Sequence, residues 1–418
     1  MKIAVTGNMG AGKSTFLTWL RKKLPAVGQV SMDALVDDLY LDPTFKRWLT
    51  ETFGTAVKSE ISERVARDPE AFRTLMSTSF ATLSERLDSA LASAQVTNPV
   101  VIAEIPLLFE SGMGLDSADL IVTLDVAEDI RLARVLQRDA RTEQAIRAKM
   151  AVQLSDFAKR SLADIVIDGT KKFDDQPAAQ ELVLAARVCQ MFGKKTWALI
   201  KSAYTQPHRG YHGIGHLVHL FEEFEKVKAH IHHPVRFAAA LLFHDYVYET
   251  NMAVYGQNES RSARAMLDWA RTHYPALMKS AGPGQSTLLA GATELILATK
   301  AHNLNSPFIQ SHPELKADAA LFLDLDLSQL SRDDEATALA DQTGIWREFS
   351  PYVLKSLFCE KRIEVLESLK ARTPLYYTDL YAPRSSLALR NMSAMQAELR
   401  RWAESCQPTI CINNEQGN

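Results

Sequence analysis

A glycine-rich segment near the N-terminus has the residues of a phosphate-binding loop. It fits the pattern G-x-x-x-x-G-K-[ST] and consists of Gly7, Asn8, Met9, Gly10, Ala11, Gly12, Lys13 and Ser14, followed by Thr15. The glycines let backbone N–H groups point at phosphate oxygens, and the helix predicted after the loop adds positive charge at its N-terminus. We therefore expect this segment to bind ATP, with Lys13 at the β- and γ-phosphates and Ser14 as a ligand of Mg²⁺.

Phosphoryl transfer to a hydroxyl group needs a residue that orients or deprotonates the hydroxyl. Asp33 is the first candidate, because it follows a short predicted strand, Gln29–Ser31, beyond the loop. An aspartate in this position could equally cap the N-terminus of the next helix. The residues alone leave both roles open.

A second group of chemically active residues lies in the other half of the chain. All 11 histidines fall between His208 and His312, so the two halves are expected to carry different chemistry. His244 and Asp245 follow the apolar run Ala238–Phe243, which places two ionisable groups at a buried helix. Burying both without partners would cost on the order of several kcal/mol, and a metal ion offsets this by binding imidazole and carboxylate together.

Further metal ligands must come from other helices. His216 lies upstream, at the start of an amphipathic segment, and Asp324 and Asp326 lie downstream. Two residues separated by one position on a helix point in different directions, so only one of the two aspartates should bind the metal. A site with mixed nitrogen and oxygen ligands suits Mn²⁺, Fe²⁺, Ni²⁺, Mg²⁺ or Zn²⁺, and the sequence does not select among them.

Basic residues and histidines accompany the predicted metal ligands. We expect them to orient and neutralise a phosphate group of a substrate, and they are Arg209, His212, Lys300 and His302. His212 lies among glycines and suits either a phosphate contact or a contact to a metal ligand. For His302, a substrate contact and a structural role are equally supported.

The two halves also differ in their predicted elements. The first half alternates apolar runs with helical segments, which predicts a parallel α/β sheet with flanking helices. Its predicted strands are Lys2–Thr6, Val100–Glu104, Leu120–Asp125 and Asp164–Asp168. Beyond Gly193 helical periodicity dominates, which predicts an all-α domain. We expect domains at 1–193 and 194–405 and a polar tail at 406–418.

Composition restricts the classes of function. The formal net charge of −3 gives no general attraction to nucleic acid or anionic lipid. No apolar run is long enough for a transmembrane helix, and the N-terminal MKIAVTG reads as a strand instead of a signal peptide. Cysteines are scattered without a CxxC pair, at Cys189, Cys359, Cys406 and Cys411. Reduced thiols and a cytoplasmic protein without membrane or nucleic-acid partners are expected.

Several segments of the first half, in order, resemble dephospho-CoA kinase. They are Thr6–Thr15, Ser31–Tyr40, Ala103–Glu110, Arg134–Asp139, Gln153 and Ala163–Ile167. The resemblance implies that Asp33 acts on the ribose 3′-hydroxyl of dephospho-CoA and that Arg138 contacts the ATP nucleotide. The chain departs from the family at Ser31, where an aspartate is usual, and at Ser79-Phe80, where a His-Pro pair is usual. Both departures concern the acceptor side of the site.

The second half resembles bacterial HD-superfamily proteins that are predicted metal-dependent phosphohydrolases. The segments that carry this resemblance are Pro207–His212, Phe243–Tyr248, Asn258–Ser260, Thr299–His302 and Leu323–Leu327. It implies one or two metal ions held by His216, His244, Asp245 and Asp326, with a metal-activated water that attacks a phosphate ester. Asp326 is preferred over Asp324 because its surroundings are closer to the family pattern.

The sequence thus predicts a bifunctional enzyme. One activity is ATP-dependent phosphorylation of dephospho-CoA, and the other is metal-dependent hydrolysis of a phosphorylated metabolite or nucleotide. Two alternatives remain: a kinase and phosphoesterase that repairs nucleic-acid ends, or a regulatory fusion with one inactive domain. The lack of excess positive charge disfavours the first alternative, and the presence of Lys13, Ser14, His244 and Asp245 disfavours the second.

Overall fold

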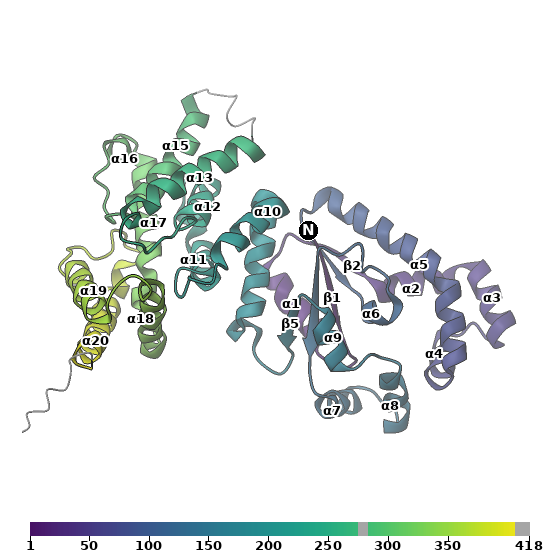
Figure 1. Cartoon of the computed structure of the whole chain (residues 1–418). Helices are drawn as coiled ribbons and strands as arrows, with labels where there is room; N and C mark the ends of the chain where they lie inside the picture. Colours follow the sequence, from purple (N-terminus) through teal and green to yellow (C-terminus); the bar gives the residue numbers. More distant parts are fainter. Residues whose placement is uncertain (275–282, 406–418) are drawn as a thin grey trace, which may run out of the picture. The chain divides into compact units, whose positions relative to one another are not determined.

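The computed structural model describes residues 1–274 and 283–405, and the side chains of residues 283–287 are not included in this description. The described residues form two compact units, one at Met1–Trp197 and one that begins at Ala198. Figure 1 labels their helices and strands. The predicted tail at 406–418, with Cys406 and Cys411, lies outside the described residues.

A parallel sheet of five strands forms the centre of the first unit (Figure 1). Its strands are β1 (Lys2–Gly7), β2 (Gly28–Ser31), β3 (Val101–Glu104), β4 (Leu120–Asp125) and β5 (Ile165–Asp168). They lie in the order β2-β3-β1-β4-β5, and each neighbouring pair is parallel. The central strands are apolar runs, as expected for strands that are covered on both faces. The predicted α/β fold class is confirmed.

Helices cover both faces of this sheet. Successive residues of a strand point to opposite sides, and the apolar side chains on each side pack against helices. In β1, Ile3 and Val5 pack with Leu20 of α1 on one face, and Ala4 packs with Leu87 of α5 on the other. The helices of the unit are α1 (Lys13–Lys23), α2 (Met32–Leu41), α3 (Pro43–Phe53), α4 (Lys58–Arg67), α5 (Pro69–Thr97), α6 (Leu108–Ser111), α7 (Glu128–Arg138), α8 (Glu143–Ala151), α9 (Asp156–Leu162) and the short η1 (Phe173–Asp175).

Every regular element described after Ala198 is a helix, which confirms the predicted all-α character of this half. Helix α10 (Pro177–Tyr204) is interrupted at Gly193, where φ is 77°. It is followed by α11 (Ile214–Val227), η2 (Lys228–His230), α12 (Pro234–Phe243), η3 (Tyr255–Gln257), α13 (Asn258–His273), α15 (Pro283–Ala298), α16 (Pro307–Ser311), α17 (Pro313–Asp326), η4 (Leu327–Ser331), α18 (Glu335–Phe349), α19 (Lys355–Lys370), η5 (Ala382–Arg384) and α20 (Ser385–Glu404).

Helix α12 is the central helix of the second unit, and eight of its residues, from Arg236 to Phe243, are buried. The ring of Phe237 lies 5.9 Å from that of Phe224 in α11 and 5.1 Å from that of Phe322 in α17, measured between centroids. Packing of α11 and α17 against α12 brings together segments that are far apart in the sequence. Among the described residues, no helix combines the length and hydropathy that are needed to cross a bilayer.

Candidate functional site

The predicted phosphate-binding loop joins β1 to α1 at the carboxyl edge of the sheet, where parallel α/β proteins bind ligands. Gly10 and Gly12 have φ values of 82° and 93°, a region that disfavours residues with a Cβ atom. A Cβ atom on Gly10 would lie 2.6 Å from the carbonyl oxygen of Arg131, so the close packing of α7 also requires glycine there. Ser14 and Thr15 are exposed in the first turn of α1.

Lys13 folds back over the loop. Its Nζ donates hydrogen bonds to the carbonyl oxygens of Gly7 at 2.8 Å and of Asn8 at 3.3 Å. Burial lowers the pKa of Lys13 to about 8, and the nearby carboxylates of Glu104 and Asp33 act in the opposite direction. The amine is thus held inside the loop, where phosphate oxygens would be stronger acceptors than two carbonyl groups.

The carboxylates of Asp33 and Glu104 are within electrostatic range of this amine. Ser31, not Asp33, caps α2, because the Ser31 hydroxyl accepts the hydrogen bond from Ala34 N at 3.4 Å. Asp33 lies in the first turn with an exposed side chain. Glu104 ends β3 and pairs in register with Ser31 of β2. Burial raises the pKa of Glu104, and the charge of Asp33 raises it further while Lys13 lowers it.

Three arginines of α7 differ in how they approach the loop. Arg131 is buried and donates to Val126 O at 2.9 Å and to the Asp156 carboxylate at 2.8 Å. Arg134 donates to the carbonyl oxygens of Gly10 at 3.3 Å and Gly169 at 3.1 Å. The predicted nucleotide contact, Arg138, instead pairs with Asp139 at 2.6 Å, and its side chain is 64% exposed.

Residues from a distant segment support the other side of the loop. The Asn8 side-chain amide donates to Asp156 Oδ1 at 2.7 Å and to Leu154 O at 3.0 Å. Met9 N donates to Gln153 Oε1 at 2.9 Å. These contacts fix the loop from the start of α9, more than a hundred residues away in the sequence.

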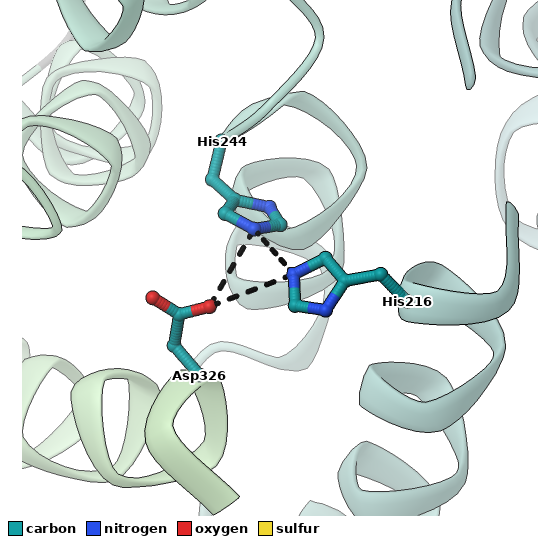
Figure 2. Close-up of side chains that lie close together, drawn as sticks. All are labelled: His216, His244 and Asp326. Carbon is teal, nitrogen blue, oxygen red and sulfur yellow. Dashed lines mark hydrogen bonds and ion pairs between the residues drawn. The ribbon is translucent and has the colours of Figure 1, made fainter. Parts of the chain in front are cut away.

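In the second unit, His216, His244 and Asp326 converge from three helices, as Figure 2 shows. The His216 and His244 Nε2 atoms are 3.2 Å apart, and Asp326 Oδ1 lies 3.7 Å and 3.6 Å from them. Asp245 Oδ2 lies 3.0 Å from His244 Nε2 and 3.6 Å from His216 Nε2. One atom from each of His216, His244 and Asp326 therefore lies within 4.8 Å of the others, a spacing that a single metal ion could bridge.

The chemistry of these donors fits a divalent metal. The His244 Nδ1–H donates to Leu241 O at 2.9 Å, which leaves Nε2 for the cluster. Burial opposes a positive charge on His244, but the Asp245 carboxylate outweighs it and raises the pKa of His244 to about 9. Burial lowers the pKa of His216 to about 3, and His244 adds to this effect. The carboxylates of Asp245 and Asp326 thus favour a positive charge beside the two imidazoles.

The alternative ligand, Asp324, points elsewhere. Its carboxylate accepts hydrogen bonds from Tyr377 N at 2.7 Å, Thr378 N at 2.7 Å and the Thr378 hydroxyl at 2.6 Å. Burial raises the pKa of Asp324 to about 6 despite these bonds. Asp324 therefore anchors the segment after α19 and does not join the cluster.

The predicted phosphate contacts divide into two groups. His212, Lys300 and His302 line a cavity of about 810 Å³ that also contains the histidine–aspartate cluster. His302 Nε2 lies 2.9 Å from Asp326 Oδ2, and His212 Nδ1 lies 2.8 Å from Glu348 Oε2. Lys300 Nζ donates to Gly256 O at 2.8 Å.

The structure gives Arg209 a different role from the predicted phosphate contact. Its terminal nitrogens donate to the carbonyl oxygens of His212 and Asp245, both at 2.8 Å, and of Tyr246 at 2.9 Å. Because backbone carbonyls occupy these donors, Arg209 positions the Asp245 segment and is not among the residues that line the cavity.

Comparisons with known proteins bear on the first unit. The dephospho-CoA kinase family model matches residues 1–175. A dephospho-CoA kinase of Rhodopseudomonas palustris (strain BisB18) is 30% identical over 190 residues, which cover 44% of this chain and 94% of that protein. One of Bradyrhizobium diazoefficiens is 32% identical over 174 residues, 40% of this chain and 85% of that protein. The first unit belongs to the dephospho-CoA kinase family. The crystal structure of TT1252 from Thermus thermophilus is 27% identical, covers 44% of this chain and 96% of that chain, and superposes with a TM-score of 0.39.

Within the dephospho-CoA kinase unit, sequence reasoning missed several supporting residues. Glu104 lies in a segment that carries the family resemblance, and its place at the end of a central strand next to β1 could have singled it out. Asp156 supports the loop through Asn8 and Arg131, but no local signal marks it. Lys159 and Glu110 form a buried ion pair at 2.9 Å. Glu110 ends a segment that carries the family resemblance, whereas Lys159 looks like an ordinary helix residue in the sequence.

Proposed function

We propose that the first unit transfers the γ-phosphoryl group of ATP to the 3′-hydroxyl group of dephospho-CoA. The observation that carries the proposal is the position of the Lys13 amine, inside the loop and within electrostatic reach of Asp33 and Glu104. Loop N–H groups and Lys13 would bind the transferred phosphoryl group, and Asp33 would orient or deprotonate the accepting hydroxyl. Mg²⁺ bound at Ser14 would neutralise charge on the phosphates.

Asp33 suits this role better than Glu104. Its side chain is exposed and has no hydrogen-bond partner among the described residues, so it can receive the acceptor hydroxyl. Glu104 is partly buried and within electrostatic range of Lys13, and burial raises its pKa. We propose that Glu104 instead positions the Lys13 amine and belongs to the metal-binding side of the site.

The identity of the acceptor is tested by incubating the purified protein with ATP and either dephospho-CoA or 5′-hydroxyl oligonucleotides. Formation of CoA is followed by chromatography, and oligonucleotide phosphorylation by gel shift. We expect phosphorylation of dephospho-CoA alone. Phosphorylation of oligonucleotide ends with dephospho-CoA unchanged would contradict the proposed acceptor.

For the second unit, we propose metal-dependent hydrolysis of a phosphate ester. The convergence of His216, His244 and Asp326, with Asp245 adjacent, supports this function. A bound divalent metal would supply a Lewis acid and activate water. His302, which is hydrogen-bonded to Asp326, and Lys300 lie in the same cavity and would donate to phosphate oxygens. His212 would do so only through its Nε2, because Glu348 holds its Nδ1.

This proposal is tested first by metal analysis and then by activity. Purified full-length protein is dialysed against chelator and titrated separately with Mn²⁺, Fe²⁺, Ni²⁺, Mg²⁺ and Zn²⁺, with uptake measured by mass spectrometry. The metal-loaded protein is then assayed on a panel of phosphorylated metabolites and nucleotides. Protein that takes up none of these metals would contradict the metal site, and uptake without any phosphate release would contradict the hydrolase.

A further inference from the structure

Among the described residues, one arginine that lines the cavity of the second unit forms no ion pair and leaves its two terminal nitrogens without a hydrogen-bond acceptor. Four basic residues line the cavity: Lys300, Lys361, Arg362 and Arg372. Lys300 donates to a backbone carbonyl, Lys361 pairs with Glu364 at 2.9 Å, and Arg372 donates to the carbonyl oxygens of Ala301 and His302 at 3.0 Å.

Arg362, in α19, differs from the other three. Its Nε donates to Gln342 Oε1 at 2.9 Å. Within residues 1–274 and 283–405, no carboxylate oxygen lies within 4.0 Å of its guanidinium and no acceptor is hydrogen-bonded to its two terminal nitrogens. Asp341 acts on Arg362 electrostatically, but its carboxylate forms an ion pair with Arg332 at 3.4 Å.

The surroundings of Arg362 make an unpaired charge unfavourable. Burial lowers the pKa of its guanidinium, and its surroundings include the uncharged phenol groups of Tyr211, Tyr248 and Tyr255. A charge in aromatic surroundings is stabilised when an anion pairs with it. Among the described residues no carboxylate pairs directly with the guanidinium, and Asp341, which acts on it electrostatically, pairs with Arg332, so an anionic ligand of the cavity would complete the pairing.

Tyr211 connects this arginine with the metal cluster. Its ring centroid lies 5.4 Å from that of His216, and Arg362 and Asp326 both act on its phenol group electrostatically. Arg362 and the cluster thus line the same cavity, and Arg362 and Asp326 are both within electrostatic range of the Tyr211 phenol. The cavity wall is mainly apolar, with contributions from Ile345, Phe349, Leu357, Phe358 and Val365.

We propose that Arg362 binds a second anionic group of the ligand whose phosphate lies at the metal cluster. The substrate class is then a phosphate ester with an apolar body and a second acidic group at a distance from the phosphate. This inference rests on the proposed hydrolase for the phosphate end, and Arg362 is the residue that determines specificity at the other end.

The test measures binding, so that it does not depend on turnover. Full-length protein loaded with Mn²⁺ is titrated calorimetrically with phosphonoalkanoates of increasing chain length and with the methyl esters of their carboxyl groups. The C–P bond of the phosphonate is not cleaved by hydrolysis, and each ester replaces the charged carboxylate with an uncharged group that is one methyl larger. We expect a chain length at which the acid binds about 10- to 100-fold more tightly than its ester, the usual range for a charge-assisted hydrogen bond.

Variants then assign the preference to Arg362. In Arg362→Met, the acid should bind no more tightly than its ester, and the ester should bind as it does to the unmodified protein. Arg362→Lys should retain part of the preference, because it keeps the charge without the planar pair of donors. Arg400→Met is the matched control, since Arg400 is 60% exposed, pairs with Glu367 on the surface and does not line the cavity.

The outcomes separate this inference from the hydrolase proposal. If the unmodified protein binds acid and ester equally at every length, or binds neither, the inference is wrong. It is also wrong if Arg362→Met keeps the preference. Hydrolysis of the panel of phosphorylated metabolites and nucleotides is measured in parallel. Tighter binding of the acid without any hydrolysis would support the second-anion site and contradict the hydrolase. Hydrolysis without tighter binding of the acid would support the hydrolase and contradict the second-anion site.

Discussion

The two candidate sites of this chain are built in opposite ways. The phosphate-binding loop is one continuous segment whose backbone forms the site, with Lys13 bonded to carbonyl oxygens of Gly7 and Asn8 in the same loop. The candidate metal centre consists of side chains from α11, α17 and the end of α12, and His216 and Asp326 are separated in the sequence by about half of the second unit. A continuous site depends on local backbone geometry, whereas an assembled site depends on helix packing.

This difference determines how each site responds to substitution. Phosphate binding by backbone groups survives most side-chain changes, so its chemistry is concentrated in a few residues such as Lys13. The metal centre has no backbone component among the described atoms, so each of its side chains is expected to affect metal affinity directly. Because each site lies within its own compact unit, a substitution in one should leave the other unchanged.

The largest effect is expected for Lys13→Ala in the kinase unit. Loss of the amine removes charge stabilisation from the transferring phosphoryl group and should lower kcat/KM for dephospho-CoA phosphorylation by about 10³-fold or more. The exposed Lys22 of α1 is the control, and Lys22→Ala should keep activity within about twofold. Coupled-assay kinetics provide the measurement. Retained activity in Lys13→Ala would show that the loop does not act through its lysine.

His244→Ala should have the next largest effect, in the assembled site. Removal of one imidazole ligand should weaken metal binding by more than about 100-fold and abolish phosphatase activity, while the kinase rate stays unchanged. Metal content after gel filtration checks this outcome. His230→Ala, at an exposed residue of η2, is the control. A drop in kinase rate in His244→Ala would contradict the independence of the two sites.

Asp33→Asn tests whether the acceptor side of the kinase site depends on one carboxylate. An orienting or proton-accepting role predicts a kcat that is lower by about 10²- to 10⁴-fold, with an unchanged KM for ATP, because Asp33 acts on the acceptor. Steady-state kinetics with each substrate varied separates the two constants. Asp38→Asn, at an exposed residue of the same helix, should behave like the unmodified protein. Equal effects of both substitutions would mean that Asp33 is an ordinary surface residue of α2 without a specific role at the acceptor.

The sequence was informative where the signal is local. The apolar runs predicted the central strands, and the loop motif indicated the segment between β1 and α1. Residue type and position suggested His216, His244 and either Asp324 or Asp326, and the resemblance to HD-superfamily proteins favoured Asp326. The structure brings His216, His244 and Asp326 together. Side-chain direction could not be predicted in the same way. Arg209 and Asp156 have the residue types of ligand contacts, but Arg209 holds carbonyl groups and Asp156 holds Asn8 and Arg131. Those partners are fixed only by tertiary packing.

The smallest effect is expected at Asp324, and the comparison with Asp326 is the sharpest test of the assembled site. The two aspartates are neighbours in α17, but Asp324 accepts bonds from Tyr377 and Thr378 whereas Asp326 faces the two histidines. Asp326→Asn should weaken metal binding at least about tenfold. Asp324→Asn should leave metal content unchanged and lower the free energy of unfolding by about 1–3 kcal/mol, because the amide NH₂ of asparagine would face a backbone N–H donor.

Metal analysis and urea denaturation of the two variants give the decisive pair of measurements. The expected pattern is crossed: one variant loses metal and the other loses stability. If Asp324→Asn loses metal while Asp326→Asn retains it, α17 presents its other face to the cluster, and Asp324 instead of Asp326 is the metal ligand. A loss of metal in both variants would instead mean that the anchoring of Tyr377 and Thr378 by Asp324 is needed to hold Asp326 in place. That coupling is physically reasonable, because Tyr377 also donates to the carbonyl oxygen of His302, whose ring is bonded to Asp326.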